Sequence, residues 1–425
     1  MALGGVDLPV QKCIILHFNF YLLDATNLPF WMRPIQRPHQ PTRPRGQPPA
    51  TTHNTPNKMT GAAAASGPGQ AQTLSSLHRD YVHSIAFDHY GRRFATCSGD
   101  RTVRVWDASG DSWSSAPGSE WQAHRGSVTQ ISWAHPEFGQ LLATCGSDHA
   151  ATVWEERVGG LGLPGAQSAE ATGTGTSGAA AVGNQPATRW VNKAQLTDAR
   201  KAVTCVQFAP RHLGLKLATG SADGIVRIYE AIDVANLNHW PMNGSIDAEV
   251  GGKGGELGVT SLSWCGGRFE PPTLVVGGSS GAVSVYRYSD ASRAWNLIVT
   301  LPKHDRGVLD VSWAPNVGRS YHLIASCGQD NVLRIHRLKR GTSADGQQKT
   351  TASLELESSQ VLNTGGAEVW RCEWNVTGTV LASSGDGGVV QLWKSDYRKD
   401  WTCVSEVHGD TQGGAAIAAA TKMIS

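Results

Sequence analysis

Residues 95–107, ATCSGDRTVRVWD, join a run of small residues to a Gly-Asp pair and then to alternating valines that end on tryptophan. A Gly-Asp pair between two apolar runs is typical of a tight turn, and alternation of apolar and polar residues predicts a strand that is buried on one face. This stretch therefore predicts two antiparallel strands joined by a short turn.

The same pattern recurs five more times along the chain. The further copies are LLATCGSDHAATVWE (141–155), LKLATGSADGIVRIYE (215–230), TLVVGGSSGAVSVYRY (273–288), HLIASCGQDNVLRIHRL (322–338) and VLASSGDGGVVQLWK (380–394). Every copy places a turn residue six positions before an aromatic or histidine ring. These pairs are Asp100 and Trp106, Asp148 and Trp154, Asp223 and Tyr229, Ser280 and Tyr286, Asp330 and His336, and Gly387 and Trp393.

Each copy follows a second alternating segment that ends on an aromatic residue. These segments are VHSIAF (82–87), VTQISW (128–133), VTCVQF (203–208), VTSLSW (259–264), VLDVSW (308–313) and VWRCEW (369–374). With a further strand after several of the rings, one repeat holds four strands. Repeats of this kind are typical of WD40 β-propeller blades, so the sequence predicts an all-β propeller of six blades.

The repeated polar residues are interpreted as structural. A histidine precedes three of the alternating segments, and a turn aspartate can accept hydrogen bonds from that histidine and from the turn amides. Positions of one type repeated around a ring indicate blade structure rather than catalysis. The structural positions are His78, Asp100, Trp106, His124, Asp148, Trp154, Asp223, Tyr229, His304, Asp330 and Trp393.

Composition excludes several classes of function. The chain has 425 residues, and its 37 Lys+Arg nearly balance its 35 Asp+Glu, so no strong field favours nucleic acid. No apolar run is long enough for a transmembrane segment. The eight cysteines form no CxxC pair, which favours reduced, buried thiols and an intracellular compartment. No HExxH motif is present, and we expect no enzyme activity, no cofactor and no metal.

The two ends of the chain differ from the repeats. Residues 1–73 include a Pro/Arg-rich stretch and an Ala/Gly-rich stretch, which predict a disordered tail. An extension upstream of a start at Met59 and an organelle-targeting leader remain alternatives, the latter because the tail is poor in acidic residues. The predicted propeller spans 74–408 and a flexible tail spans 409–425, with a Gly/Ala-rich loop at 159–187.

Stretches outside the repeat positions carry a more specific resemblance. They are WAHPEFGQ (133–140), FAPRHLG (208–214), LATGSADGIVRIYEAIDVANLNHW (217–240), WAPNVGRSYH (313–322) and WNVTGTVLASSGDGGVVQLWK (374–394). From about Leu74 to Val407 the chain resembles the Sec-thirteen/Seh-one family of WD40-repeat scaffold proteins. The stretches at 217–240 and 374–394 favour the nucleoporin branch over the branch that serves the COPII vesicle coat.

The resemblance implies a role without catalysis. Members form an open six-bladed ring, and a helical-solenoid nucleoporin of the Y-shaped nuclear pore complex donates a seventh blade. It further implies contact with other scaffold nucleoporins, support of nucleocytoplasmic transport at the nuclear envelope, and a second place in an amino-acid-signalling complex at the vacuole or lysosome. A COPII-coat propeller and a closed, peptide-binding WD40 adaptor remain alternatives, and no direct contact with nucleic acid is expected.

An open ring would leave strand edges that recruit another polypeptide. We expect the accepting edges within residues 78–107 and 369–408. The candidate contacts are Val82, Ile85, Val103, Val105, Val369, Val390 and Leu392.

Overall fold

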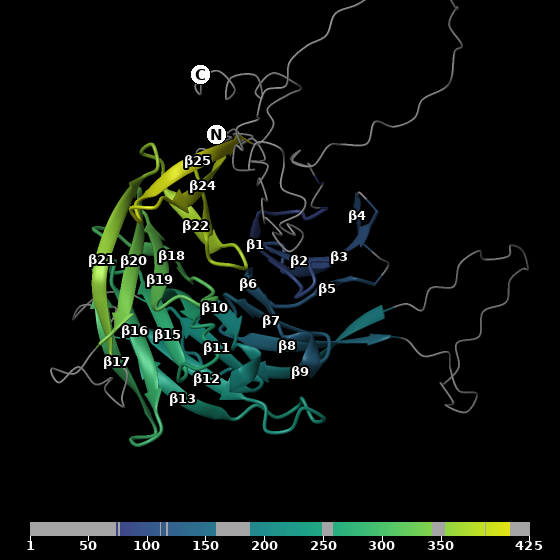
Figure 1. Cartoon of the computed structure of the whole chain (residues 1–425). Helices are drawn as coiled ribbons and strands as arrows, with labels where there is room; N and C mark the ends of the chain where they lie inside the picture. The colour runs from purple at the N-terminus through teal and green to yellow at the C-terminus, as the bar shows by residue number, and fades with distance from the viewer. Residues whose placement is uncertain are drawn as a thin grey trace, which may run out of the picture.

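A computed structural model describes residues 74, 77–110, 112–115, 118–158, 188–248, 258–341, 353–386 and 388–408. The predicted tails at 1–73 and 409–425 and the predicted loop at 159–187 lie outside these residues. The described residues form six antiparallel sheets arranged around a centre, together with two short 3-10 turns at Pro136–Phe138 and Arg211–Leu213 (Figure 1). The prediction of an all-β, six-bladed propeller is confirmed. None of the described helices has the length and hydropathy needed to cross a bilayer.

Each sheet is one blade, and its strands follow one another in chain order. Blade 1 contains β1 (Val82–Phe87), β2 (Arg93–Ser98), β3 (Thr102–Ser109) and β4 (Ser112–Ser114), with β5 (Glu120–Gln122) also paired to β3. Blade 2 contains β6 (Val128–Trp133), β7 (Leu141–Gly146), β8 (Ala151–Val158) and β9 (Thr188–Leu196). Blade 3 contains β10 (Val203–Phe208), β11 (Lys216–Ser221), β12 (Ile225–Glu230) and β13 (Met242–Asp247).

The second half of the ring repeats this order. Blade 4 contains β14 (Val259–Trp264), β15 (Thr273–Gly278), β16 (Val283–Ser289) and β17 (Ala294–Leu301). Blade 5 contains β18 (Val308–Trp313), β19 (Tyr321–Gly328), β20 (Val332–Arg340) and β21 (Leu354–Asn363). Blade 6 contains β22 (Val369–Trp374), β23 (Val380–Gly385), β24 (Val389–Ser395) and β25 (Trp401–His408).

The turn between the second and third strands has left-handed backbone at the residue that follows the Asp position. The residue after the turn position has a positive φ: 72° at Arg101, 66° at His149 and 61° at Asn331. At the equivalent place blade 4 has Gly281 at 86°, where an added Cβ would lie 2.2 Å from the His304 carbonyl oxygen. Left-handed backbone of this kind favours Gly and tolerates few other residues.

The core lies between the blades rather than within one layer. Each cluster of buried apolar side chains joins the back of one sheet to the front of the next. In the cluster between blades 1 and 2, for example, Val103 and Val105 of β3 pack against Val128, Ile131 and Trp154 of blade 2. A blade therefore buries both faces only if it has a neighbour on each side.

Candidate functional site

The ring has six blades but only five apolar clusters among its described residues. The clusters join blades 1 and 2, 2 and 3, 3 and 4, 4 and 5, and 5 and 6. A closed six-bladed ring would need a sixth cluster between blades 6 and 1. The innermost strands agree, because each packs extensively on the next from β1 to β22, whereas β22 does not pack in this way on β1. We call the space between these two blades the open sector.

The burial of one position on the third strand of each blade shows where the open sector lies. This position is the residue just before the ring position of each repeat, and it faces the next blade. The first five residues at this position are almost fully buried: Val105 0%, Val153 0%, Ile228 2%, Val285 0% and Ile335 3%. The sixth, Leu392, is only partly buried and belongs to none of the five clusters. Leu392 therefore lacks the neighbour that its five equivalents have.

The face of blade 6 toward the open sector is apolar. Its register matches that of blade 2, so Val380 and Ala382 correspond to Leu141 and Ala143. Leu141 is 1% exposed and Ala143 0%, whereas Val380 and Ala382 are only partly buried. Apolar surface that every other blade covers is thus left accessible on β23 and β24 of blade 6.

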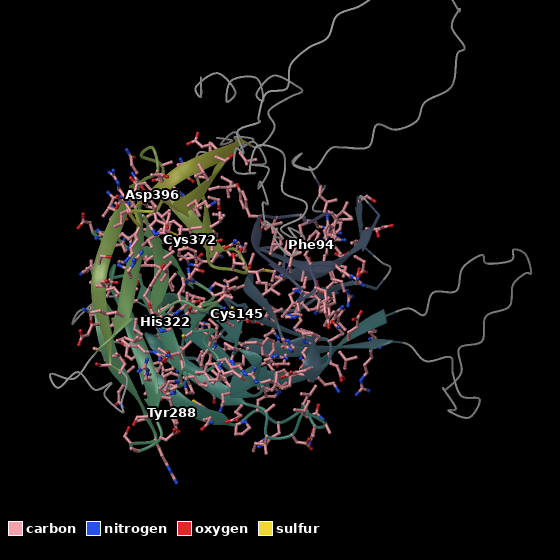
Figure 2. The ribbon with its side chains drawn as sticks, in the orientation of Figure 1. Phe94, Cys145, Tyr288, His322, Cys372 and Asp396 are labelled. Carbon is pink, nitrogen blue, oxygen red and sulfur yellow. The ribbon has the colours of Figure 1, made fainter. Side chains whose placement is uncertain are left out.

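The opposite wall, on blade 1, is covered in part by aromatic rings. Phe94, labelled in Figure 2, stacks on Trp106 with ring centroids 5.7 Å apart and contacts Trp113 at 4.7 Å. Closer to the centre, Val82 and Ile85 of β1 are partly buried, although their blade 2 equivalents are 0% and 4% exposed. The uncovered part of this wall is therefore its inner strand.

Side chains of the inner strands also join the blades by hydrogen bonds. Gln130 Oε1 accepts from the Val206 amide at 2.8 Å, and Ser132 Oγ accepts from the Phe208 amide at 3.0 Å. Asp310 Oδ2 accepts from the Cys372 amide at 3.1 Å in the same way. In blades 2 and 4 the third and fifth residues of the inner strand both accept from the strand that follows, whereas in blade 3 the fifth residue, Gln207, does so and in blade 5 the third, Asp310.

Blade 6 differs from this pattern of inter-blade hydrogen bonds because its inner strand has charged residues at both the third and the fifth positions. Arg371 stands where Gln130 and Asp310 accept, and a guanidinium can only donate. Arg371 Nη2 donates to the His83 carbonyl oxygen at 3.2 Å, a bridge from blade 6 to blade 1. Glu373 occupies the fifth position, where a carboxylate can accept from a backbone amide.

The predicted structural residues lie inside the blades, where they form buried networks. In blade 1, His78 Nδ1 lies 3.0 Å from Asp100 Oδ2 and its Nε2 lies 2.9 Å from Thr96 Oγ1. Trp106 Nε1 donates to the same hydroxyl at 3.1 Å. Burial lowers the pKa of His78 against the opposing effect of Asp100, and this favours a neutral ring.

Blades 2 and 5 repeat the network with substitutions. His124 and Asp148 lie 3.0 Å apart, and Trp154 Nε1 donates to Thr144 Oγ1 at 3.0 Å. In blade 5, where His304 lies 3.0 Å from Asp330, the ring position is His336. Its Nε2 pairs with Ser326 Oγ at 3.0 Å, and burial lowers the pKa of His336 to about 3.

Blades 3 and 6 keep only parts of it. Asp223 pairs with Arg227 Nη2 at 2.8 Å instead of a histidine, and the Tyr229 hydroxyl donates to Asp198 at 2.9 Å. Trp393 Nε1 donates to Ser383 Oγ at 2.9 Å. No group of three or more His, Cys, Asp or Glu residues in the described part of the chain is arranged to hold a metal ion.

Three of the expected contact residues are placed elsewhere, and the prediction is wrong for them. Val103 and Val105 are fully buried between blades 1 and 2, and Val369 is buried between blades 5 and 6. Alternation sends successive side chains to opposite faces, so membership of an edge blade does not decide which neighbour a residue meets. Val390 corresponds to Ala151 on the face toward the open sector but is only 3% exposed.

The sequence-based prediction missed Val380, Ala382 and the aromatic wall around Phe94. Carrying the pairing register of a complete blade onto blades 1 and 6 would have found them, because equivalent positions face the same way in every repeat.

Comparison with known proteins agrees with this architecture. The family model described as "WD domain, G-beta repeat" matches residues 70–107, 116–155, 191–230, 295–337 and 357–394. The matches omit β14–β16 of blade 4, in which Ser280 and Tyr286 replace the turn aspartate and the tryptophan.

Curated relatives match most of the chain. Nucleoporin SEH1-A of Xenopus laevis is 38% identical over 350 residues, which cover 80% of this chain and 89% of the relative. Nucleoporin SEH1 of Homo sapiens is 39% identical over 367 residues, which cover 81% and 92%. Nucleoporin SEH1 of Danio rerio is 37% identical over 349 residues, which cover 80% and 88%.

Proposed function

The chain belongs to the nucleoporin SEH1 family of WD40-repeat proteins, and we propose that it serves the nuclear pore scaffold by accepting a β-blade from a helical-solenoid nucleoporin of the Y-shaped complex. The observation that carries this proposal is the count of five inter-blade clusters for six blades. A seventh blade in the open sector would supply the missing contacts on both flanks at once.

The packing between the existing blades predicts which side chains the donated blade must present on each face. The back of blade 2 combines Leu141 with the smaller Ala143 and Val153, whereas its front offers bulkier side chains, such as Leu142 and Trp154. The donated blade should therefore turn large apolar residues toward Leu392 and Ala382. Toward Phe94 and Trp106 it should turn small ones. Permanent interfaces of this type bury about 2,000 Å² or more.

The geometry of the open sector favours this proposal over a closed peptide-binding adaptor, which would need a sixth cluster. A COPII-coat role and a place in an amino-acid-signalling complex at the vacuole or lysosome would use the same open sector with another donor. Affinity purification of the full chain followed by mass spectrometry distinguishes these partners. Recovery of vesicle-coat subunits without pore subunits would overturn the pore assignment.

The test of blade acceptance is co-purification with the solenoid nucleoporin. We expect the wild-type chain to be poorly soluble or oligomeric alone and monodisperse with its partner. Leu392→Glu places a charge on the apolar flank and should abolish the complex. Val361→Glu is the matched control, because Val361 lies on the outer strand of blade 5 and is 57% exposed. A monomeric wild-type chain that gains nothing from the partner, or an intact complex with Leu392→Glu, would refute the proposal.

A further inference from the structure

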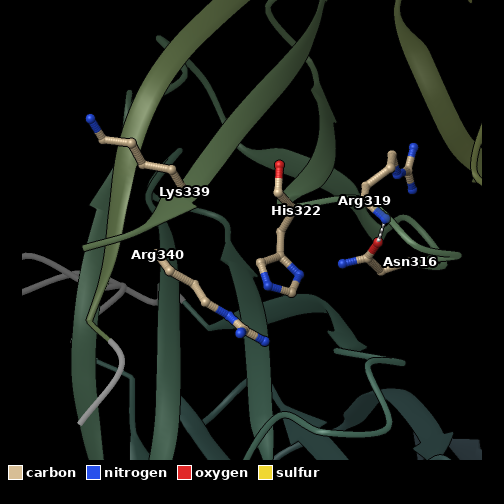
Figure 3. A pocket seen from close by; sticks show the side chains of 6 residues that line it. Asn316, Arg319, His322, Lys339 and Arg340 are labelled. Atoms are coloured by element: carbon tan, nitrogen blue, oxygen red, sulfur yellow. Dashed lines mark hydrogen bonds between the residues drawn. The ribbon is translucent and has the colours of Figure 1, made fainter. Parts of the chain in front are cut away.

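A small cavity lies at the end of blade 5 that is remote from the His304 network. Its volume is about 280 Å³. Its walls come from the loop after β18, from the start of β19 and from the end of β20. The lining residues are Asn316, Arg319, Ser320, His322, Lys339 and Arg340 (Figure 3). Strands β19 and β20 have eight and nine residues, against six each in β11 and β12 of blade 3, and this added length builds the wall.

Positive charge dominates this cavity. Arg319, Lys339 and Arg340 line it, and the guanidinium carbon of Arg337 lies 4.3 Å from the centre of the Tyr321 ring beside it. Among the described residues, the negative charge that faces these cations is that of Glu270, which lies in the loop after β14 in blade 4.

Glu270 is already shared among several donors. Its carboxylate contacts Arg340 and lies 3.5 Å from Arg287 Nη2 and 3.4 Å from His322 Nε2. The hydrogen bond from His322, with help from Arg340 and against the effect of burial, lowers the pKa of Glu270 to about 2. One buried anion thus faces several cations, and the cavity keeps an excess of positive charge.

His322 supplies an independent sign of a ligand. The residue is 2% exposed, and its ring packs edge-on against Trp313 at 5.7 Å. Its Nε2 faces Glu270, whereas its Nδ1 is buried and has no hydrogen-bond partner among the described residues. A buried polar atom without a partner is costly and calls for an explanation. In Figure 3 the His322 side chain extends between those of Arg340 and Asn316.

We propose that this cavity binds a phosphate group. Arginine and lysine are the usual donors to phosphate oxygens, and the buried Nδ1 of His322 is a further polar atom at the cavity that a phosphate group can pair with. At about 280 Å³ the cavity is smaller than the pockets of roughly 300–1,000 Å³ that hold drug-sized ligands, so a single phosphate fits better than a nucleotide. The group can come from free phosphate or from a phosphorylated side chain of another protein.

The test is calorimetric titration of the purified full chain with inorganic phosphate at constant ionic strength. We expect saturable binding and a Kd that rises about fivefold in Lys339→Gln, since one charge-assisted contact to the anion is lost. Lys339 is exposed, so this variant should fold, and circular dichroism checks it. Lys303→Gln removes the same charge from an exposed site before β18, at the opposite end of blade 5, and should leave the Kd unchanged.

A second titration with O-phosphoserine identifies the source of the group. Tighter binding of O-phosphoserine than of inorganic phosphate supports a phosphorylated protein, and the reverse order supports free phosphate. The proposal is overturned if chloride or sulfate gives the same signal as phosphate. It is equally overturned if Lys339→Gln and Lys303→Gln bind phosphate alike.

Discussion

Truncation of two equivalent residues measures whether the open sector is empty in the isolated chain. Ile335 and Leu392 occupy the same repeat position, but Ile335 is 3% exposed inside the cluster between blades 5 and 6, whereas Leu392 is partly buried at the open sector. Substitution by alanine removes three carbon atoms from each. For Ile335 the lost transfer free energy plus the cavity should cost about 3–4 kcal/mol.

For Leu392 the cost should be smaller. Water already reaches this side chain and no closed cavity forms, so we expect a loss of about 1 kcal/mol of unfolding free energy. Urea unfolding at low protein concentration, followed by tryptophan fluorescence, gives both values from the midpoint and the m-value. Equal costs at the two positions would show that Leu392 is covered as Ile335 is, and the reasoning from five clusters would fail. With the donated blade bound, Leu392→Ala should weaken the complex about tenfold.

The buried histidines predict that the unfolding free energy falls as pH drops below about 6.5, since the unfolded chain then binds protons that the folded chain excludes. Burial lowers the pKa of His78, His124, His304 and His336. In His336→Phe the urea midpoint should therefore change less between pH 6.5 and pH 5 than it does in wild type. An equal change of the midpoint with pH in the two proteins would contradict this. The cysteines predict one fast-reacting thiol among the described residues when a Cys13→Ser chain is treated with Ellman's reagent, because Cys403 is exposed. Burial raises the pKa of Cys97, Cys145 and Cys265 to about 12, so these should react only on unfolding, and a fast phase that survives Cys403→Ser would contradict the prediction.

The number of blades could be predicted from the sequence because each blade is specified locally. A turn that needs a positive φ, such as the one at Arg101, restricts its residues, and the alternation of the flanking strands fixes their register. Blade 4 was found even though Ser280 and Tyr286 replace the usual pair, since the strand pattern on either side is intact.

The two walls of the open sector could be predicted only in part. Val82, Ile85 and Leu392 are placed there by the structure, whereas Val103 and Val369 face the interior. Which face of a strand packs on the preceding blade and which on the following blade depends on the direction in which the blades follow one another around the ring. The sequence of a single blade does not reveal that direction. The cavity beside His322 was missed for a related reason, because Glu270 comes from another blade.

The inner strand of blade 6 suggests how a repeat sequence keeps a ring open. If blade 6 were to pack on blade 1 as blade 2 packs on blade 3, the third residue of its inner strand would have to accept the Ile85 amide, as Gln130 accepts that of Val206. Arg371 cannot accept, and it contacts the His83 carbonyl oxygen instead. Closing the ring with the same hydrogen bonds would thus leave the Ile85 amide without an acceptor, at a cost of about 1–3 kcal/mol. It would also place a guanidinium in an interface that elsewhere contains neutral or acidic side chains. The open sector therefore depends on the residue type at the third position of the inner strand of blade 6 as well as on the number of repeats.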